Sequence, residues 1–357
     1  MEEKNYQVKR NLSAIEKTTS LLNDLPDYMT RFVSHMSTMK NSSRLTVYEY
    51  VRDISIIFQI ITEINPVIHN KKDITVDGLD HLNTDDFEDI MMKLQNGYEK
   101  NGKTFMDDNT SRARKLASIR ALYKYLLGKN LIKNNPAAAF PSPKITVQPI
   151  TFLSDDEISL RLDVITTGAG LTERQQVFSD RYRTRDMAMV YLMLSTGIRI
   201  SECVGIDIDD IDWEENSVYL ERKGRKFQNV YFDKKCAELL SAYMDEREDM
   251  DLDEPTTALF ISRNGTRITP RSVQRMVKKY ASVAVKNKHI TPHKLRSTYA
   301  TGIYNSTGDI YLAQNALGHK SVNTTARYAN VSDEKRREAS TAAENWLSNV
   351  TNGMIKK

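Results

Sequence analysis

Two basic side chains in the C-terminal half stand at the start of a predicted helix. The stretch "ITPHKLRSTYA" brings Thr291 and Pro292, residue types that favour the N-cap and the first position of a helix. His293 and Arg296 follow three residues apart, so they share one face of the first turn. Because a helix start has unpaired N–H groups, this face suits a phosphate oxyanion. A solvated histidine–arginine pair is the simpler alternative.

A second charged pair lies inside an apolar stretch, "LSTGIRISECVGI" at residues 194–206. Arg199 and Glu202 stand there among isoleucines and valine, where a charge costs free energy unless it is paired or functional. At a spacing of three residues the two side chains can pair with each other, which is the structural alternative. A third basic group, Lys223, lies in "RKGRK". It either projects into a groove or belongs to a plain surface turn.

The last candidates lie near the C-terminus, in "LGHKSVNTTARY" at residues 317–328. His319 precedes Tyr328 by nine residues, and small polar residues suited to a turn and a helix start separate them. The chain has 17 tyrosines, so residue type alone does not distinguish Tyr328. Only its companions along the sequence can do so.

Each motif is weak alone, but their order along the chain is specific. The series "TGIRISE…RKGRK…HKLRSTYAT…LGHKSVNTTARY" resembles the catalytic signature of the tyrosine site-specific recombinases, the phage-integrase and Xer family. The resemblance covers residues 150–331. The matching residues, in family order, are Arg199, Lys223, His293, Arg296, His319 and Tyr328.

Three positions depart from the family's pattern. Ser297 stands where the family often has a second histidine. The hairpin lysine usually lies within Gly-Lys-Gly, whereas Arg222 precedes Lys223 here and Lys226 competes for its role. Lys320 stands where serine is common. The choice between the two lysines therefore stays open.

The resemblance implies phosphoryl transfer on DNA without a cofactor or a metal ion. Arg199 and Arg296 would bind the non-bridging phosphate oxygens and stabilise their charge in the transition state. Tyr328 would attack phosphorus, giving a 3′-phosphotyrosyl link and a free 5′-hydroxyl. No Asp/Glu cluster in the sequence suits two magnesium ions, which agrees with arginines in their place.

The remaining members of the set would move protons or orient their neighbours. By resemblance, Lys223 protonates the departing 5′-oxygen, and His293 handles the tyrosine proton and contacts the phosphate. His319 would donate a hydrogen bond to the phosphate or steady Tyr328. Glu202 matches an acidic position of the family and would orient adjacent groups.

The charge is unevenly distributed, although the net charge of the 357 residues is only +4. Residues 73–89 hold seven acids and no lysine or arginine, whereas residues 109–145 hold only basic charges. Such a block either contacts phosphates or forms a solvated helix face. The candidates for DNA contact on this basic helix are Arg112, Arg114, Lys115, Arg120 and Lys124.

A linker divides the chain. The stretch "NPAAAFPSPKITVQPI" at residues 135–150 contains four prolines, and Ser154 with Glu157 predicts a capping box just beyond it. We therefore predict a helical DNA-binding domain over residues 1–148 and a catalytic domain with a C-terminal helix over residues 149–357.

The predicted fold class is mainly α with a small β-sheet (α+β). Apolar residues at helical spacing predict helices over residues 43–64 and 111–130, and "SVYLE" and "NVYF" predict a β-hairpin over residues 216–233 with Gly224 at its tip. By resemblance, the first domain is a SAM-like core-binding domain, and the two domains form a clamp on DNA.

The implied partners follow from the family. They are double-stranded DNA with an inverted-repeat recombination site, a homotetramer on two such sites, and a DNA translocase or another accessory factor. The tail after Tyr328 predicts a helix with one apolar face that docks on a neighbouring protomer. Its apolar residues are Ala339, Ala342, Ala343, Trp346 and Leu347.

Composition bears on location. The N-terminus lacks the apolar core of a signal peptide, and the most apolar run, residues 187–198, is too short for a membrane span. The two cysteines, Cys203 and Cys236, have no metal-ligand spacing. We expect a cytoplasmic protein without a membrane partner.

Several biological roles fit these residues. The length and layout resemble the single-recombinase XerS type, which favours Xer-like chromosome dimer resolution. An integrase or excisionase of a mobile element is the alternative, although the first ~40 residues are too few for a substantial arm-binding domain. A type IB topoisomerase has a similar catalytic set, and a DNA-binding module without chemistry is a further class.

Overall fold

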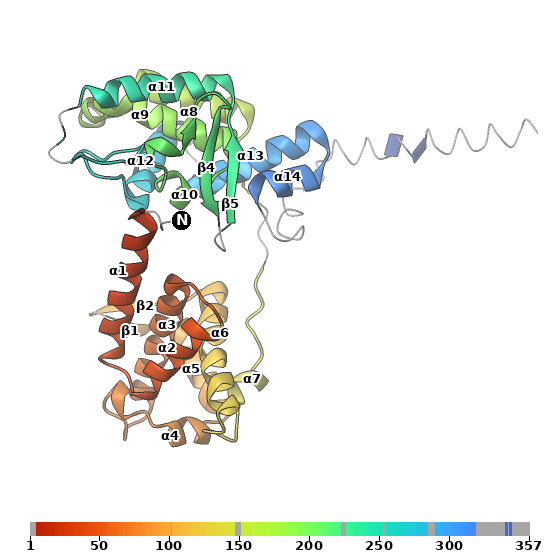
Figure 1. The fold of residues 1–357 in the computed structure, drawn as a ribbon. Helices are drawn as coiled ribbons and strands as arrows, with labels where there is room; N and C mark the ends of the chain where they lie inside the picture. The colour runs from red at the N-terminus through yellow and green to blue at the C-terminus, as the bar shows by residue number, and fades with distance from the viewer. Residues whose placement is uncertain are drawn as a thin grey trace, which may run out of the picture. The chain divides into compact units, whose positions relative to one another are not determined.

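The computed structural model describes residues 5–100, 102–146, 151–222, 226–250, 252, 255–284, 290–318, 340–341 and 343–344. The chain divides into two compact units, residues 1–147 and residues 148–357. Both units are mainly helical with a small antiparallel sheet (Figure 1). The mainly α class with a small sheet is confirmed, whereas the strands of the first unit were not predicted. None of the described helices is both long and apolar enough to cross a lipid bilayer.

The first unit is a helical bundle with one short hairpin. Its helices are α1 (Asn5–Leu22), α2 (Tyr28–Thr38), α3 (Arg44–Ile64), η1 (Lys71–Asp73), α4 (Val76–His81), α5 (Thr84–Asn96), α6 (Asn109–Gly128) and α7 (Pro136–Ala139). Strands β1 (Tyr98–Lys100) and β2 (Lys103–Phe105) pair antiparallel between α5 and α6.

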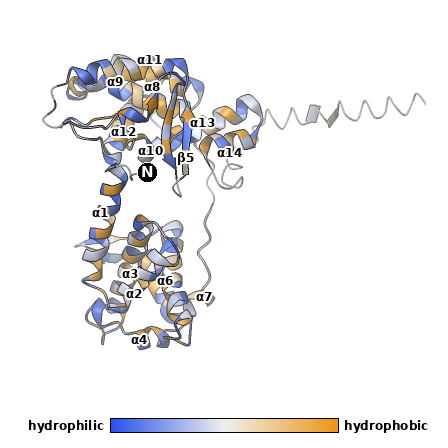
Figure 2. Cartoon of the chain, viewed as in Figure 1, coloured by the Kyte–Doolittle hydropathy of each residue, from blue (hydrophilic) through white to orange (hydrophobic). Residues whose placement is uncertain are grey.

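Helix α3 is the centre of this bundle and contacts α1, α2, α5 and α6. The predicted helices over residues 43–64 and 111–130 are confirmed as α3 and α6. Both predicted apolar faces are buried, because each faces another helix of the bundle. The helices alternate between hydrophobic and hydrophilic colour in Figure 2, as amphipathic helices do. The buried residues of the two faces are Val47, Val51, Ile54, Phe58, Ile61, Leu116, Ile119, Tyr123 and Leu126.

The second unit surrounds one long helix, α9, with shorter elements. Its helices are α8 (Asp155–Thr167), α9 (Glu173–Thr196), α10 (Ile200–Cys203), η2 (Ile208–Asp210), α11 (Lys234–Glu248), α12 (Pro270–Ala284), α13 (Pro292–Thr307) and α14 (Ile310–Leu317). Helix α9 packs against α8, α11 and α13, and α13 packs against α14. A buried carboxylate, Asp186 of α9, accepts a hydrogen bond of 2.8 Å from the hydroxyl of Tyr280 in α12.

The small sheet of this unit has the antiparallel order β3–β4–β5. Its strands are β3 (Ile211–Asp212), β4 (Ser217–Arg222) and β5 (Lys226–Tyr231). The predicted hairpin is confirmed by the pairing of β4 with β5, in which Arg222 stands opposite Lys226. The predicted tip, with Lys223 and Gly224, lies outside the described residues.

Local sequence signals set several helix starts in this unit. Ser154 and Glu157 form the predicted capping box of α8, with the Ser154 N–H donating to Glu157 at 2.9 Å. Pro292 opens α13 as the pair with Thr291 predicts, and Pro270 opens α12 in the same way. Thr291 is the N-cap of α13, but its side chain makes no capping hydrogen bond.

Candidate active site

Arg199 and Glu202 form a pair at a sharp turn between two helices. Helix α9 ends at Thr196, and Gly197 follows in the left-handed conformation with φ of 61°. Glu202 accepts two hydrogen bonds of 2.8 Å from Arg199, one from its backbone N–H and one from its guanidinium. Glu202 is buried, whereas a third of the Arg199 side chain is exposed. The pairing that the spacing allows is therefore present, and it still leaves Arg199 accessible to a substrate.

Arg296 ties together the ends of two helices. Arg296 is only 2% exposed. Its guanidinium donates to the carbonyl of Gly197, at the end of α9, and to the carbonyl of Leu317 at 2.6 Å, at the end of α14. Both acceptors lie at helix C-termini, where the partial negative charge favours a cation. Arg296 thus holds the turn that leads to Arg199 against the helix end that leads to His319.

His293 and Arg296 differ in their surroundings although they lie one turn apart. His293 is exposed in the first turn of α13, whereas Arg296 points into the unit. The hydroxyl of Ser297, the departure from the family's pattern, donates to the carbonyl of His293 at 3.1 Å. The start of α13 therefore exposes His293 to the solvent, whereas Arg296 on the same helix is buried.

Arg222 is a further member of this group, and its position along the sequence does not mark it as functional. It ends β4, is buried, and donates to the carbonyls of Leu317 at 2.6 Å and Ala316 at 3.3 Å. Burial lowers the pKa of its guanidinium, an effect that the nearby Glu202 carboxylate opposes and Arg199 reinforces. The one available signal was that an arginine replaces the glycine usually found before the hairpin lysine.

Gly197 and Gly318 make close approaches that a larger residue would prevent. A Cβ at Gly197 would lie 2.2 Å from the ring of Tyr299, and a Cβ at Gly318 would lie 2.7 Å from Nη1 of Arg222. Both glycines have positive φ, which other residues rarely adopt. The two glycines therefore allow tight turns at the ends of α9 and α14, beside the carbonyls that accept hydrogen bonds from Arg296 and Arg222.

Part of the predicted catalytic set is brought together by these contacts. Arg199, Glu202, His293 and Arg296 belong to segments that meet around the ends of α9 and α14. Lys223, His319 and Tyr328 lie outside the described residues, as does the side chain of Lys226. Among the described residues, no group of three or more His, Cys, Asp or Glu side chains is arranged to hold a metal ion.

Most of the DNA-contact candidates on α6 have hydrogen-bond or ion-pair partners in the first unit. Arg114 pairs with the buried Asp53 of α3 although its own side chain is 42% exposed. Lys115 is 2% exposed, and its ammonium lies 2.6 Å from Asp107. The prediction for Lys115 is therefore corrected, since its charge is satisfied within the bundle. Part of the basic block therefore forms ion pairs within the first unit.

Arg120 and Arg112 also have partners in the first unit. Arg120 donates to the carbonyls of Ala137 and Phe140 and to the hydroxyl of Ser142, and so holds the chain after α7 against α6. Arg112 donates to the side-chain carbonyl of Gln95 at 2.5 Å. Neither side chain projects freely from the helix.

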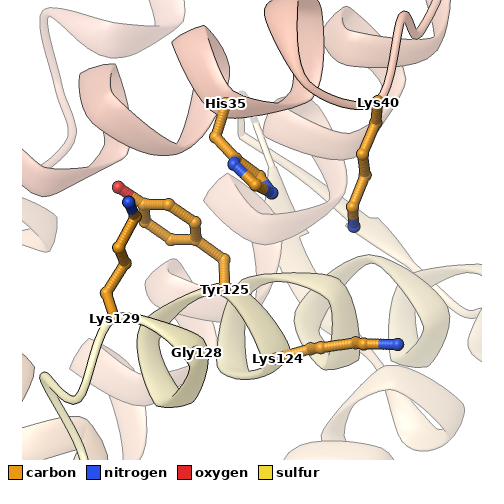
Figure 3. Close-up of a pocket in the computed structure, with 6 residues that line it drawn as sticks. All are labelled: His35, Lys40, Lys124, Tyr125, Gly128 and Lys129. Atoms are coloured by element: carbon orange, nitrogen blue, oxygen red, sulfur yellow. The ribbon is translucent and has the colours of Figure 1, made fainter.

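Lys124 lies in a basic pocket at the end of α6 (Figure 3). Lys40 extends from the end of α2 beside His35, while Lys124 and Lys129 extend from α6 and from its C-terminal end. The His35 and Tyr125 rings lie together, with centroids 4.9 Å apart. The complete lining is His35, Lys40, Lys124, Tyr125, Gly128 and Lys129.

Comparisons with known proteins identify the family of the chain. The model of the phage integrase family matches residues 172–335. The tyrosine recombinase XerC of Caldanaerobacter subterraneus is 30% identical over 322 residues, which cover 88% of this chain and 86% of that protein. The XerC of Thermodesulfovibrio yellowstonii is 30% identical over 311 residues, covering 85% of this chain and 91% of that protein.

Solved structures show the same fold. The XerH site-specific recombinase bound to palindromic difH substrate superposes with a TM-score of 0.65 at 18% identity, covering 92% of this chain and 89% of that one. A lambda integrase dimer bound to a COC′ core site has a TM-score of 0.59 at 16% identity, covering 84% and 93%. With these relatives along most of its length, the chain belongs to the phage integrase family as a Xer-type tyrosine recombinase, an enzyme of site-specific DNA cleavage and rejoining.

Proposed function

We propose that this recombinase cleaves DNA through Tyr328, with Arg199 and His293 at the scissile phosphate and the buried Arg296 supporting them. The observation that carries the proposal is the contact of Arg296 with the carbonyls of Gly197 and Leu317. It joins three segments that are distant in sequence and that hold members of the catalytic set. Chance packing gives no reason for these segments to meet.

Arg199 is the side chain that we assign to the phosphate oxygens. It is permanently charged, partly exposed and fixed by the buried Glu202 carboxylate, so its guanidinium is oriented before the substrate arrives. Loss of one such donor typically slows catalysis by ~10²–10³. Arg296 supports the same phosphate through its positive charge and through the helix ends that it joins.

Proton transfer completes the proposed reaction. The Tyr328 oxygen forms a bond to phosphorus as the bond from phosphorus to the 5′-oxygen breaks. The phenolic proton passes to His293 or to solvent, and Lys223 or Lys226 supplies a proton to the departing 5′-oxygen. Since a phenol is a better leaving group than an alcohol, the 5′-hydroxyl of another strand can reverse the step and complete an exchange.

The test of this assignment is covalent trapping. Nicked duplexes that carry an inverted-repeat site lose the short strand after cleavage, so the protein–DNA adduct accumulates and is visible on a denaturing gel. Tyr328→Phe should form no adduct, whereas Tyr311→Phe, which changes an exposed tyrosine of α14, should form as much as wild type. An adduct with Tyr328→Phe would overturn the assignment.

The role that we propose is chromosome dimer resolution in the cytoplasm by a homotetramer on two DNA sites. Its support is that relatives named XerC match most of this chain. Deletion of the gene should then produce unresolved chromosome dimers and filamentous cells. Excision of a flanking DNA element by the enzyme would favour the alternative, an integrase of a mobile element.

Two parts of this assembly can be tested separately. Deletion of residues 335–357 should preserve strand cleavage and abolish synapsis if the tail docks on a neighbouring protomer. A DNA translocase or another accessory factor would appear as a requirement for recombination but not for cleavage.

We also propose that Lys40, Lys124 and Lys129 contact the DNA backbone. These three lysines line the pocket at the end of α6, and Lys124 is also one of the DNA contacts that the sequence predicts. Changing Lys124 to alanine should reduce the salt dependence of DNA binding by about one counterion. A matched change of Lys235, an exposed lysine of α11 paired with Glu238, should not.

A further inference from the structure

Arg222 is a buried arginine whose position is unusual for the end of a β-strand. Its side chain lies inside the catalytic unit and donates to the last two carbonyls of α14, those of Ala316 and Leu317. The carbonyls at the end of a helix have no partner within the helix, so a cation there satisfies them. The carbonyl of Leu317 accepts two hydrogen bonds of 2.6 Å, one from Arg222 and one from Arg296.

The end of α14 is shaped around this guanidinium. Gly318 adopts a left-handed conformation with φ of 62°, and a Cβ there would lie 2.7 Å from Nη1 and 3.0 Å from Cδ of Arg222. Any larger residue would push the arginine away from the two carbonyls. Strand β4 and helix α14 therefore meet through one close contact that depends on both residues.

Two proposed catalytic residues are attached directly to this contact. Lys223 is the next residue after Arg222, and His319 is the second residue after Leu317. Consecutive Cα atoms are about 3.8 Å apart, so an anchor one or two residues away limits how far each of them can move. An anchor at Arg222 and Leu317 thus constrains the lysine and the histidine together.

We propose that Arg222 is a positioning residue that holds the catalytic lysine in register with the helix end leading to His319. The proposal rests on the assignment of Lys223 as the proton donor to the 5′-oxygen. Without Arg222, the segment that leads to the lysine would lose its contact with the end of α14. A misplacement of about 1 Å can cost ~10²-fold in rate.

The test compares ordinary DNA with DNA that has sulfur in place of the bridging 5′-oxygen. On the sulfur substrate, the Tyr328 oxygen bonds to phosphorus as the phosphorus–sulfur bond breaks, and a thiolate leaves. A thiol has a reference pKa of about 8.5, far below that of an alcohol, so the thiolate departs without a proton. A variant that has lost only the positioned lysine should therefore recover on sulfur DNA.

The variant is Arg222→Met, which keeps a long apolar side chain and removes the donors. We expect cleavage of ordinary DNA to fall by ~10² and cleavage of sulfur DNA to stay within about tenfold of wild type. Arg222→Lys keeps one charge and should show a smaller defect of the same kind. If the methionine variant does not fold, the lysine variant carries the test by the same ratio of rates.

Arg247→Met is the matched control. Arg247 is also buried and donates to two carbonyls of the same unit, those of Thr256 at 2.8 Å and Ala258 at 3.0 Å. Its loss should lower stability and should change cleavage of both substrates by the same factor. The difference between the two arginine variants then separates positioning from a general loss of structure.

Three outcomes would overturn the proposal. Normal cleavage of ordinary DNA by Arg222→Met is one, and equal slowing on both substrates is another. The third is recovery of Arg247→Met on sulfur DNA to the same extent.

Lys223→Ala tests the assignment on which the proposal rests, because this variant must itself recover on sulfur DNA. If only Lys226→Ala recovers, the assignment of Lys223 fails, whereas the measured effect of Arg222 stands and applies to Lys226, its partner across the hairpin.

Discussion

A methyl group at Gly197 should damage the site by a known steric route. Gly197 ends α9 with φ of 61°, and a Cβ there would lie 2.2 Å from Cδ1 and 2.9 Å from Cε1 of Tyr299. The carbonyl of Gly197 also accepts a hydrogen bond from Arg296. The change Gly197→Ala therefore strains the backbone, displaces the partly buried ring of Tyr299 and disturbs the anchor of a catalytic arginine.

The chain offers a matched control for the backbone part of this cost. Gly308 ends α13 in the same left-handed conformation, with φ of 69°, and a Cβ there would meet no atom within 4 Å. Gly308→Ala should lower the free energy of unfolding by about 1–2 kcal/mol, the cost of a left-handed residue with a Cβ. Gly197→Ala should cost about 1–3 kcal/mol more, the usual penalty of overpacking.

Urea unfolding followed by tryptophan fluorescence measures this difference. Both tryptophans, Trp213 and Trp346, belong to residues 148–357, so the signal reports on the catalytic unit. Truncation of the ring by Tyr299→Leu should relieve much of the extra cost in the Gly197→Ala background. The same truncation should be additive with Gly308→Ala, which makes a double-mutant cycle decisive.

Steric overlap between residue 197 and Tyr299 is refuted if the two glycine variants lose equal free energy of unfolding. It is also refuted if the effect of Tyr299→Leu is additive with that of Gly197→Ala. Covalent trapping on nicked DNA gives a second readout. Gly197→Ala should slow adduct formation and Gly308→Ala should not, because only the first lies at the Arg296 anchor. Equal cleavage by both variants would show that the anchor does not matter for chemistry.

Three further predictions concern buried ionisable side chains. Glu202→Gln should lower the free energy of unfolding by about 1.5–3 kcal/mol, the value of one charge-assisted hydrogen bond. It should also slow adduct formation, because Arg199 loses its carboxylate partner. Unchanged rates of adduct formation would contradict this prediction. Arg161 is 1% exposed, its guanidinium nitrogens have no hydrogen-bond partner within the described part of the chain, and burial lowers its pKa to about 10. Arg161→Met should therefore raise the free energy of unfolding by about 1–3 kcal/mol in urea, and a lower value would refute that account. Burial raises the pKa of the Cys236 thiol to about 12, so its contribution to stability is complete below about pH 8.5 and is lost as pH rises from there. Over this range, unfolding free energy should fall less steeply in Cys236→Ala than in wild type, by up to about 1.4 kcal/mol per pH unit.

The sequence was a good guide wherever a property depends on neighbours along the chain. The apolar spacing of Val47, Val51 and Ile54 predicts α3, because a helix repeats every 3.6 residues whatever it packs against. Ser154 and Glu157 predict the start of α8 for the same local reason. The order of the catalytic motifs was sufficient for the family, since the chemistry needs those residue types at positions that the fold must bring together.

Charge was a poor guide because a basic residue looks the same in sequence whether it binds DNA or a carboxylate. Lys115 meets Asp107 from outside its own helix, and Arg114 meets Asp53, which is 61 residues away. No local pattern connects such partners. The Arg114–Asp53 pair in particular follows only from the packing of α6 against α3.

The residue types, their order and the helices that bear them were thus determined by the sequence itself. Only the tertiary structure decided that Arg222 and Arg296 meet at the carbonyl of Leu317, 95 and 21 residues away. The physical reason is that a helix end has unpaired carbonyls, and which cation satisfies them depends on how the helices pack. Sequence spacing carries no record of that contact, whereas in the folded chain Arg296 joins it to the turn that leads to Arg199.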